Sequence, residues 1–249
     1  LSRLQRRVKA VTEALESMRT RTALEVALFE VWNDLRWYFR RSRTPCKKVL
    51  LDVAKTWVRL LAPYAPFMCE ELWSMYHEEG EFVSLAPYPE PHMEDRDERA
   101  EFREVLVKEV LDDIMSILKV VKMESPKKAY VYTAEDWSYT VLKEALAQKE
   151  GLDIGALMRR LSLDAEMREH MKEAAAYLKA LAKDIHAMDE VKVGGFLKTG
   201  WSREDERELL REAADFLSRE VGLSVVVDPP ERHPKAASAR PMRPAIIIE

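Results

Sequence analysis

The chain has 249 residues, of which 47% are apolar and 34% charged, and this composition is typical of a well-folded globular protein of one or two domains. No apolar run reaches the roughly 20 residues that a membrane-spanning helix needs, and the basic start lacks the apolar core of a secretory signal. We therefore expect no membrane partner, and the two widely spaced cysteines favour a reduced, cytoplasmic protein.

The net charge of −4 is unevenly distributed along the chain. Residues 1–59 contain 14 Lys/Arg and 6 Asp/Glu, which gives +8, whereas residues 60–101 contain 2 and 11, which gives −9. A basic stretch beside an acidic one suggests a face that binds a polyanion and another that repels it. The alternative is that both stretches are solvated surface, or that they pair within the protein.

The first two predicted elements are helices. Apolar side chains recur three and four positions apart over residues 2–17, which predicts an amphipathic helix. A second helix is predicted over residues 23–42, after a capping-box pattern formed by Thr22 and Glu25. This helix is apolar on two faces, so it either lies at the centre of a bundle or offers its second face to a partner.

Three more helices complete the first half. The third is predicted over residues 45–62, and the fourth runs from the Pro63–Pro66 corner to a stop at Gly80. Several prolines in residues 81–97 exclude a regular helix and indicate an extended crossover on the surface. A fifth helix is predicted over residues 97–122 from its apolar periodicity.

The second half mixes helices with short strands. Strands are predicted at residues 128–133, 223–227 and 245–248, and helices at residues 133–148, 153–162, 164–187 and 202–220. Thr133 and the pair Ser202/Asp205 are the expected caps, Gly222 closes the last helix, and Val193–Gly200 is expected to be a loop because it holds three of the seven glycines. The predicted fold is mostly α: a helix bundle over residues 1–122, followed by a small α+β domain over residues 123–249.

No stretch predicts an autonomous active site. Gly195 and Gly200 have the spacing of a phosphate loop, but Trp201 stands where a lysine is required. His77 begins a zinc-protease pattern, but Glu81 stands where the second histidine is needed. We therefore expect no catalytic residue, metal or cofactor on this chain.

Two segments of the first half carry a family resemblance. Asn33–Arg41 (Asn-Asp-Leu-Arg-Trp-Tyr-Phe-Arg-Arg) and the proline corner Leu61–Phe67, with Glu70–Trp73 after it, resemble the helix bundle that follows the catalytic core of class I aminoacyl-tRNA synthetases. Asn33–Arg41 is most similar to the leucine-specific enzymes of the archaeal and eukaryotic type. In the second half, Tyr130–Trp137 and Arg240–Glu249 look like the C-terminal extension of the archaeal leucine enzyme.

This resemblance implies a role in leucine–tRNA ligation. It identifies the chain as an anticodon-binding-type bundle with a C-terminal extension, which binds the tRNA body and the long variable arm of leucine tRNAs. The absent catalytic domain would attach leucine with ATP and Mg²⁺, and the absent editing domain would belong to the same parent chain. The chain lacks an initiator Met and opens inside a helical pattern, which also suggests a fragment. The alternatives are the equivalent piece of a valyl or isoleucyl enzyme, or a helical protein-interaction module.

The expected tRNA-binding residues of the bundle form a basic ridge: Arg36, Arg40, Arg43, Lys47 and Lys48. The first three are four and three positions apart, and arginine pairs well with phosphate oxygens. The alternative is that Arg36 and Arg40 form ion pairs with the missing catalytic core.

The expected tRNA-binding residues of the second half lie in its tail: Lys235, Arg240, Arg243, Ile247, Ile248 and Glu249. The basic residues would supply charge, and the C-terminal residues would present backbone groups, a carboxylate and apolar surface to unstacked bases of the variable arm. The alternative, compatible with the first, is that the last strand completes a small sheet.

Overall fold

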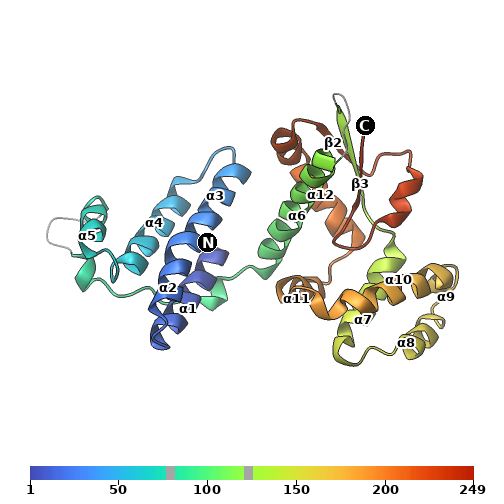
Figure 1. The fold of residues 1–249 in the computed structure, drawn as a ribbon, viewed down its shortest axis with the longest axis horizontal. Helices are drawn as coiled ribbons and strands as arrows, with labels where there is room; N and C mark the ends of the chain where they lie inside the picture. The colour runs from blue at the N-terminus through green and yellow to red at the C-terminus, as the bar shows by residue number, and fades with distance from the viewer. Residues whose placement is uncertain (77–81, 121–125) are drawn as a thin grey trace. The chain divides into compact units, whose positions relative to one another are not determined.

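The computed structural model describes residues 1–76, 82–120 and 126–249, and it is mostly helical with one small sheet near the C-terminus (Figure 1). The predicted fold class is therefore confirmed. By internal contacts the chain divides into two compact units, Leu1–Glu98 and Arg99–Glu249. The expected domain boundary at residues 122 and 123 lies outside the described residues, so the proposed division there remains a prediction.

The first unit consists of helices joined by short connections. They are α1 (Ser2–Glu16), α2 (Thr20–Glu25), the π-helical segment η1 (Val26–Glu30), α3 (Val31–Arg41), α4 (Lys47–Leu61) and α5 (Pro66–Ser74), followed by the 3₁₀ turns η2 (Val83–Leu85) and η3 (Met93–Asp95). The structure confirms the first and third predicted helices, whereas α5 ends at Ser74 and the predicted stop at Gly80 lies outside the described residues.

A single apolar core holds these helices together. Leu4, Val8 and Val11 of α1 are buried in it, as the spacing of three and four residues predicted. The other members come from every helix of the unit: Ala14, Ala23, Ala27, Val31, Val53, Val58, Leu60, Leu61, Cys69, Trp73 and Val83. The bundle therefore folds because each helix buries an apolar face against the others.

The predicted capping box at the start of the second helix is wrong. The helix begins at Thr20, so Thr22 already lies within α2 and cannot cap it. The carboxylate of Glu25 instead accepts a hydrogen bond of 2.9 Å from Nε of Arg21, one turn earlier. Glu25 therefore belongs to an ordinary pair of opposite charges four residues apart on the helix surface, and not to a capping box.

The crossover after α5 is anchored by one carboxylate. Glu70 accepts hydrogen bonds from the main-chain N–H groups of Val83 (2.8 Å) and Ser84 (3.2 Å). The bond from Val83 is the main cause that lowers the pKa of Glu70. The described part of the crossover contains only the short turns η2 and η3 and otherwise irregular chain, as its prolines predicted.

The second unit surrounds a small sheet with helices. Its elements are α6 (Glu98–Val120), β1 (Lys128–Tyr132), α7 (Asp136–Ala147), η4 (Lys149–Gly151), α8 (Ile154–Leu161), α9 (Ala165–Arg168), α10 (Met171–Asp184), η5 (Ile185–Ala187), α11 (Glu190–Thr199), α12 (Arg203–Val221), β2 (Ser224–Val227), η6 (Pro234–Ser238) and β3 (Ala245–Ile248). All three predicted strands are present, and Ser202 and Asp205 form the predicted capping box of α12, which Gly222 closes in the left-handed conformation.

The sheet has the order β2-β1-β3. β1 pairs in parallel with β2, with Ala129 opposite Val225, and antiparallel with β3, with Ala129 opposite Ile248. A parallel pair needs a long crossover, and the chain from α7 to α12 supplies it. β1 is therefore the central strand, and the C-terminal strand β3 forms one edge (Figure 1).

The predicted glycine-rich loop at Val193–Gly200 is wrong, because these residues lie in and directly after helix α11. A Cβ atom on Gly195 would lie 2.6 Å from Cγ of Phe102 on α6, which is too close for any side chain. Gly200 ends the helix in the left-handed conformation. Gly195 therefore serves helix packing and Gly200 serves helix termination, and the segment does not form a loop.

Candidate nucleic-acid interface

The corner between α3 and α4 is held by one side chain. The hydroxyl of Tyr38 accepts a hydrogen bond of 2.8 Å from the main-chain N–H of Cys46, the residue directly before α4. Because Tyr38 lies in the last turns of α3, this bond fixes the start of α4 beside the end of α3. The short connection between the two helices therefore has a defined position.

All five residues of the predicted basic ridge are exposed around this corner. Arg36 and Arg40 lie on α3, Arg43 lies in the connection, and Lys47 and Lys48 form the first turn of α4. Among the described residues, no carboxylate forms an ion pair with Arg36, Lys47 or Lys48. The guanidinium of Arg40 lies over the ring of Trp37, 5.7 Å from its centroid.

The helix dipole adds to the positive charge of this corner. The N-terminus of a helix carries partial positive charge and normally favours acidic residues, yet the first turn of α4 contains Lys47 and Lys48 and no acidic residue. The last turn of α3 adds Arg40 and Arg41. We name the exposed residues Arg36, Arg40, Arg43, Lys47 and Lys48 the basic corner, and its electrostatic complement is a polyanion.

Part of the basic charge of the first unit is neutralised within the bundle. Asp34 of α3 accepts hydrogen bonds from Nε of Arg7 (2.7 Å) and from Nη1 of Arg3 (3.3 Å), and Arg7 also pairs with Glu30 at 3.1 Å. These arginines attach α1 to α3. Ion pairs within the bundle therefore neutralise Arg3 and Arg7. They do not neutralise Arg36, Lys47 or Lys48, which form no ion pair among the described residues.

Exposed aromatic rings lie on the same segment as the basic corner. The sequence predicted a second apolar face on this helix, but these rings were not among the predicted tRNA-binding residues. Phe29, Trp32 and Phe39 are 58%, 45% and 44% exposed. Trp32 stacks on Trp57 of α4, with ring centroids 6.2 Å apart and planes 13° apart. The spacing of Phe29, Trp32, Arg36 and Phe39 by three and four residues could have identified this face, since such spacing places side chains on one side of a helix.

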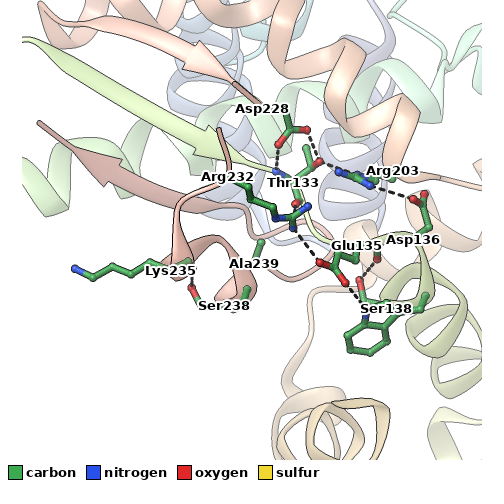
Figure 2. A network of polar contacts seen from close by, with 12 residues as sticks. Thr133, Glu135, Asp136, Ser138, Arg203, Asp228, Arg232, Lys235, Ser238 and Ala239 are labelled. Carbon is green, nitrogen blue, oxygen red and sulfur yellow. Dashed lines mark hydrogen bonds and ion pairs between the residues drawn. The ribbon is translucent and has the colours of Figure 1, made fainter. Parts of the chain in front are cut away.

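A polar network holds the chain after β2 (Figure 2). The carboxylate of Asp228 accepts hydrogen bonds from the N–H (2.9 Å) and hydroxyl (2.6 Å) of the buried Thr133, which follows β1. Arg203 donates to the Thr133 hydroxyl at 3.2 Å, and Arg232 donates to the Thr133 carbonyl at 3.3 Å. The prediction that Thr133 caps a helix is therefore wrong, because α7 begins at Asp136 and Thr133 joins the ends of two parallel strands.

The same network reaches the first turn of α7. Arg203 pairs with Asp136 at 3.1 Å, and Arg232 pairs with Glu135 at 3.6 Å. Because the parallel strands β1 and β2 end side by side, their following residues meet at one edge of the sheet. The network thereby fixes the start of the loop that leads to the tail, while Figure 2 shows the side chain of Lys235 extending away from it.

The structure separates the predicted tail residues by environment. Lys235 and Arg243 are exposed, whereas Arg240 is partly buried and lies over the ring of Tyr177, 5.1 Å from its centroid. Nη1 of Arg240 also donates hydrogen bonds to the carbonyls of Ala237 and Ala239. Arg240 therefore has a structural role in the loop, and Arg243 is the arginine that faces solvent.

The last residues form the edge of the sheet. Ile247 and Ile248 are half-buried in β3, and the carbonyl of Glu249 accepts hydrogen bonds from the N–H groups of Lys127 (2.7 Å) and Lys128 (2.8 Å). The expected last strand is therefore present, and the main chain of Glu249 is already paired. The exposed carboxylate of Glu249 and the outer edge of β3 are what remains for a ligand.

Two kinds of site are absent from the described part of the chain. No group of three or more His, Cys, Asp or Glu side chains within it is placed to hold a metal ion. None of its helices is both long enough and apolar enough to cross a membrane.

Comparison with known proteins gives consistent matches. Residues 1–132 match the model of the family described as the anticodon-binding domain of tRNA ligase. The whole chain is 42% identical to the leucine–tRNA ligase of Pyrococcus furiosus, 41% to that of Pyrococcus abyssi and 40% to that of Methanococcoides burtonii. The alignments cover 25%, 25% and 26% of these relatives, so the chain spans about a quarter of their length.

Proposed function

Because this chain belongs to the anticodon-binding domain family of tRNA ligases, we propose that it binds tRNA as the C-terminal part of a leucine–tRNA ligase. The observation that carries the proposal is the identity of about 40% over the entire chain, second unit included, to leucine–tRNA ligases. A valyl or isoleucyl origin would be expected to match through the shared bundle alone.

The basic corner is proposed to bind the backbone of the tRNA body. An A-form helix hides its base edges, so proteins contact its phosphates and 2′-hydroxyls. The exposed, unpaired side chains of Arg36, Lys47 and Lys48 can each approach a phosphate without first losing a carboxylate partner among the described residues. The paired arginines Arg3 and Arg7 lack this freedom because Asp34 holds them.

The exposed aromatic rings extend the same surface. Phe29, Trp32 and Phe39 lie on the segment that carries Arg36 and Arg40. Aromatic rings among cationic side chains suit nucleic acid, because unpaired bases stack on the rings while the cations neutralise phosphates. This combination supports a polyanion partner for the corner more than it supports a neutral protein partner.

The tail is proposed to contact the long variable arm that marks leucine tRNAs. Lys235 and Arg243 are exposed, and they would supply positive charge. The half-buried Ile247 and Ile248 and the carboxylate of Glu249 lie at the sheet edge, where unstacked bases of an arm tip can be contacted.

The reaction itself is assigned to the rest of the parent protein. That protein would ligate leucine to tRNA with ATP and Mg²⁺ in the cytoplasm, through catalytic and editing domains outside this chain. The basic corner and the tail would bind and orient the tRNA so that its acceptor end reaches the catalytic domain.

Footprinting of tRNA tests the proposal. Leucine tRNA and a tRNA with a short variable arm are probed with and without the chain, in matched buffers. We expect protection of the leucine tRNA body and of its variable arm, with no protection at the short arm. Equal protection of both tRNAs would favour the valyl or isoleucyl alternative, and absence of protection in both would favour a protein-interaction module.

A further inference from the structure

The turn before the last strand adopts a conformation that its own residues disfavour. Arg240 and Arg243 exchange two main-chain hydrogen bonds of 2.9 Å, which closes a tight turn with Pro241 and Met242 at its centre. The φ angle of Met242 is +63°, in the left-handed region that glycine or asparagine normally occupies. A residue with a large side chain holds this conformation only where surrounding contacts impose it.

Glu206 supplies the contact that holds the turn. Its Oε2 accepts a hydrogen bond of 2.9 Å from the main-chain N–H of Met242. Glu206 lies on α12 and is only 2% exposed, and Pro241 and Met242 are buried as well. The turn is therefore attached to the most buried face of a long helix, 36 residues earlier in the chain.

The surroundings of Glu206 show that its buried carboxyl group is an energetically unfavourable way to fill this part of the core. The hydroxyl of Tyr139 and the indole N–H of Trp201 lie beside the same carboxyl group, but neither forms a hydrogen bond of good geometry among the described residues. Oε1 of Glu206 also lacks a hydrogen bond there. Burial raises the pKa of Glu206 to about 7, while the bond from Met242 acts in the opposite direction. A buried, partly satisfied carboxyl lowers stability, so a packing role alone does not account for it.

The position of the Arg240–Arg243 turn determines which side chains of the tail face solvent. On one side of the turn, Arg240 is fixed over Tyr177 and hydrogen-bonded to Ala237 and Ala239. On the other side, Arg243 is exposed and the chain continues directly into β3. Without the hydrogen bond to Glu206, the turn would no longer hold Arg240 inward and Arg243 outward.

We infer that Glu206 is a positioning residue for the RNA-binding tail: by holding the Arg240–Arg243 turn, it directs Arg243 and the start of β3 toward the variable arm of the bound tRNA. This inference rests on the proposed function. Glu206 itself is buried, so it would act through the turn and not by contact with RNA.

The test compares two substitutions of Glu206 in the full 249-residue chain. Glu206→Gln keeps an acceptor for Met242, whereas Glu206→Leu removes it at similar size. Leu217→Ala is the matched control, because Leu217 is fully buried on the same helix three turns away and its truncation destabilises α12 without touching the turn. The probes are a leucine tRNA transcript and the same transcript with a shortened variable arm, together with hydrogen exchange at the Met242 amide.

We expect Glu206→Leu to lower the affinity for the long-arm transcript about tenfold, to leave the short-arm transcript nearly unaffected, and to speed exchange at Met242. Glu206→Gln should keep the affinity for the long-arm transcript and the exchange rate at Met242 close to those of the unmodified chain. Leu217→Ala should change neither the preference for the long arm nor the exchange at Met242. Unchanged preference and exchange in a folded Glu206→Leu protein would overturn the inference, as would an equal loss of preference in Leu217→Ala. If the unmodified chain shows no preference for the long arm, the proposed function of the tail fails, and so does the directing role of Glu206; the exchange rate then decides only whether Glu206 holds the turn.

Discussion

The indole Nε1 of Trp57 on α4 donates a hydrogen bond of 2.6 Å to the main-chain carbonyl of Ala27 in η1. In the same π-helical segment, the N–H of Val31 bonds to the carbonyl of Val26, five residues back, and so leaves the carbonyl of Ala27 without its α-helical partner. Trp57 replaces that partner. A side chain that inserts into a helical hydrogen-bond ladder is a known cause of such local distortions.

This relationship predicts that Trp57→Phe destabilises the bundle. The substitution leaves the buried carbonyl of Ala27 unsatisfied, which corresponds to about 1–3 kcal/mol of unfolding free energy, measured by urea denaturation. Trp32→Phe is the control, because Trp32 is exposed and Trp57 is its one ring partner among the described residues. Equal effects of the two substitutions would show that the hydrogen bond contributes nothing specific.

The basic corner predicts a salt-dependent effect. Lys47→Ala with Lys48→Ala should weaken tRNA binding and reduce the slope of log affinity against log salt by roughly 1 for each lost phosphate contact. Lys9→Ala is the control, because Lys9 is exposed on α1 and pairs with Glu13 at 3.7 Å. The measurement is a titration of tRNA at several salt concentrations. An unchanged slope in the double variant would remove the phosphate-binding interpretation.

The two arginines of the tail turn should behave differently. Arg243→Ala should weaken binding to long-arm tRNA and leave the thermal midpoint almost unchanged, because Arg243 is exposed. Arg240→Ala should lower stability by about 1–2 kcal/mol, since it removes the stacking on Tyr177 and two hydrogen bonds. Thermal unfolding and tRNA titration of both variants test this contrast, and identical profiles would contradict it.

The adjacent glycines of α11 provide a matched pair. Gly195→Ala should destabilise the second unit by about 1–3 kcal/mol, because its Cβ would lie 2.6 Å from the Phe102 ring. Gly194→Ala should stabilise by about 0.5–1 kcal/mol, since nothing lies within 4 Å of its Cβ and alanine favours a helix. Denaturant unfolding of both variants measures the signs, and destabilisation by both would refute the packing argument.

Glu206 predicts an unusual dependence of stability on pH. Its pKa is raised by burial to about 7 in the folded chain, above the ordinary value of 4.5. The folded state therefore binds more protons than the unfolded state between these values. The contribution is fully present below about 4.5 and is lost as pH rises through about 7, by an amount on the order of a few kcal/mol.

The difference in unfolding free energy between the unmodified chain and Glu206→Gln, measured from pH 4 to pH 8, isolates this effect. Among the described residues, the titratable groups that interact with Glu206 are Tyr139, Tyr177 and Asp228, and they are the same in both proteins. A difference that does not vary with pH would show that Glu206 titrates like an exposed glutamate.

Local sequence determined the helices and strands whose signals are short-range. The three- and four-residue spacing of α1 and the capping box of α12 each depend on residues within one or two turns, and both predictions are confirmed. The valine and isoleucine runs similarly determined β2 and β3. The family resemblance, carried by contiguous motifs, is confirmed by the same logic.

Tertiary structure decided what depended on distant partners. Glycine propensity indicated a loop at Gly195, but close packing against Phe102 requires glycine inside a helix. Thr133 had the local chemistry of a cap, but Asp228, 95 residues away, engages its hydroxyl. Likewise, three arginines of similar appearance received different roles: Asp34 holds Arg7, Tyr177 holds Arg240, and Arg36 has no carboxylate partner among the described residues. The sequence alone determines the charges and their spacing. Whether a charge remains available to RNA depends on the groups that the fold brings beside it, and those groups lie far along the chain.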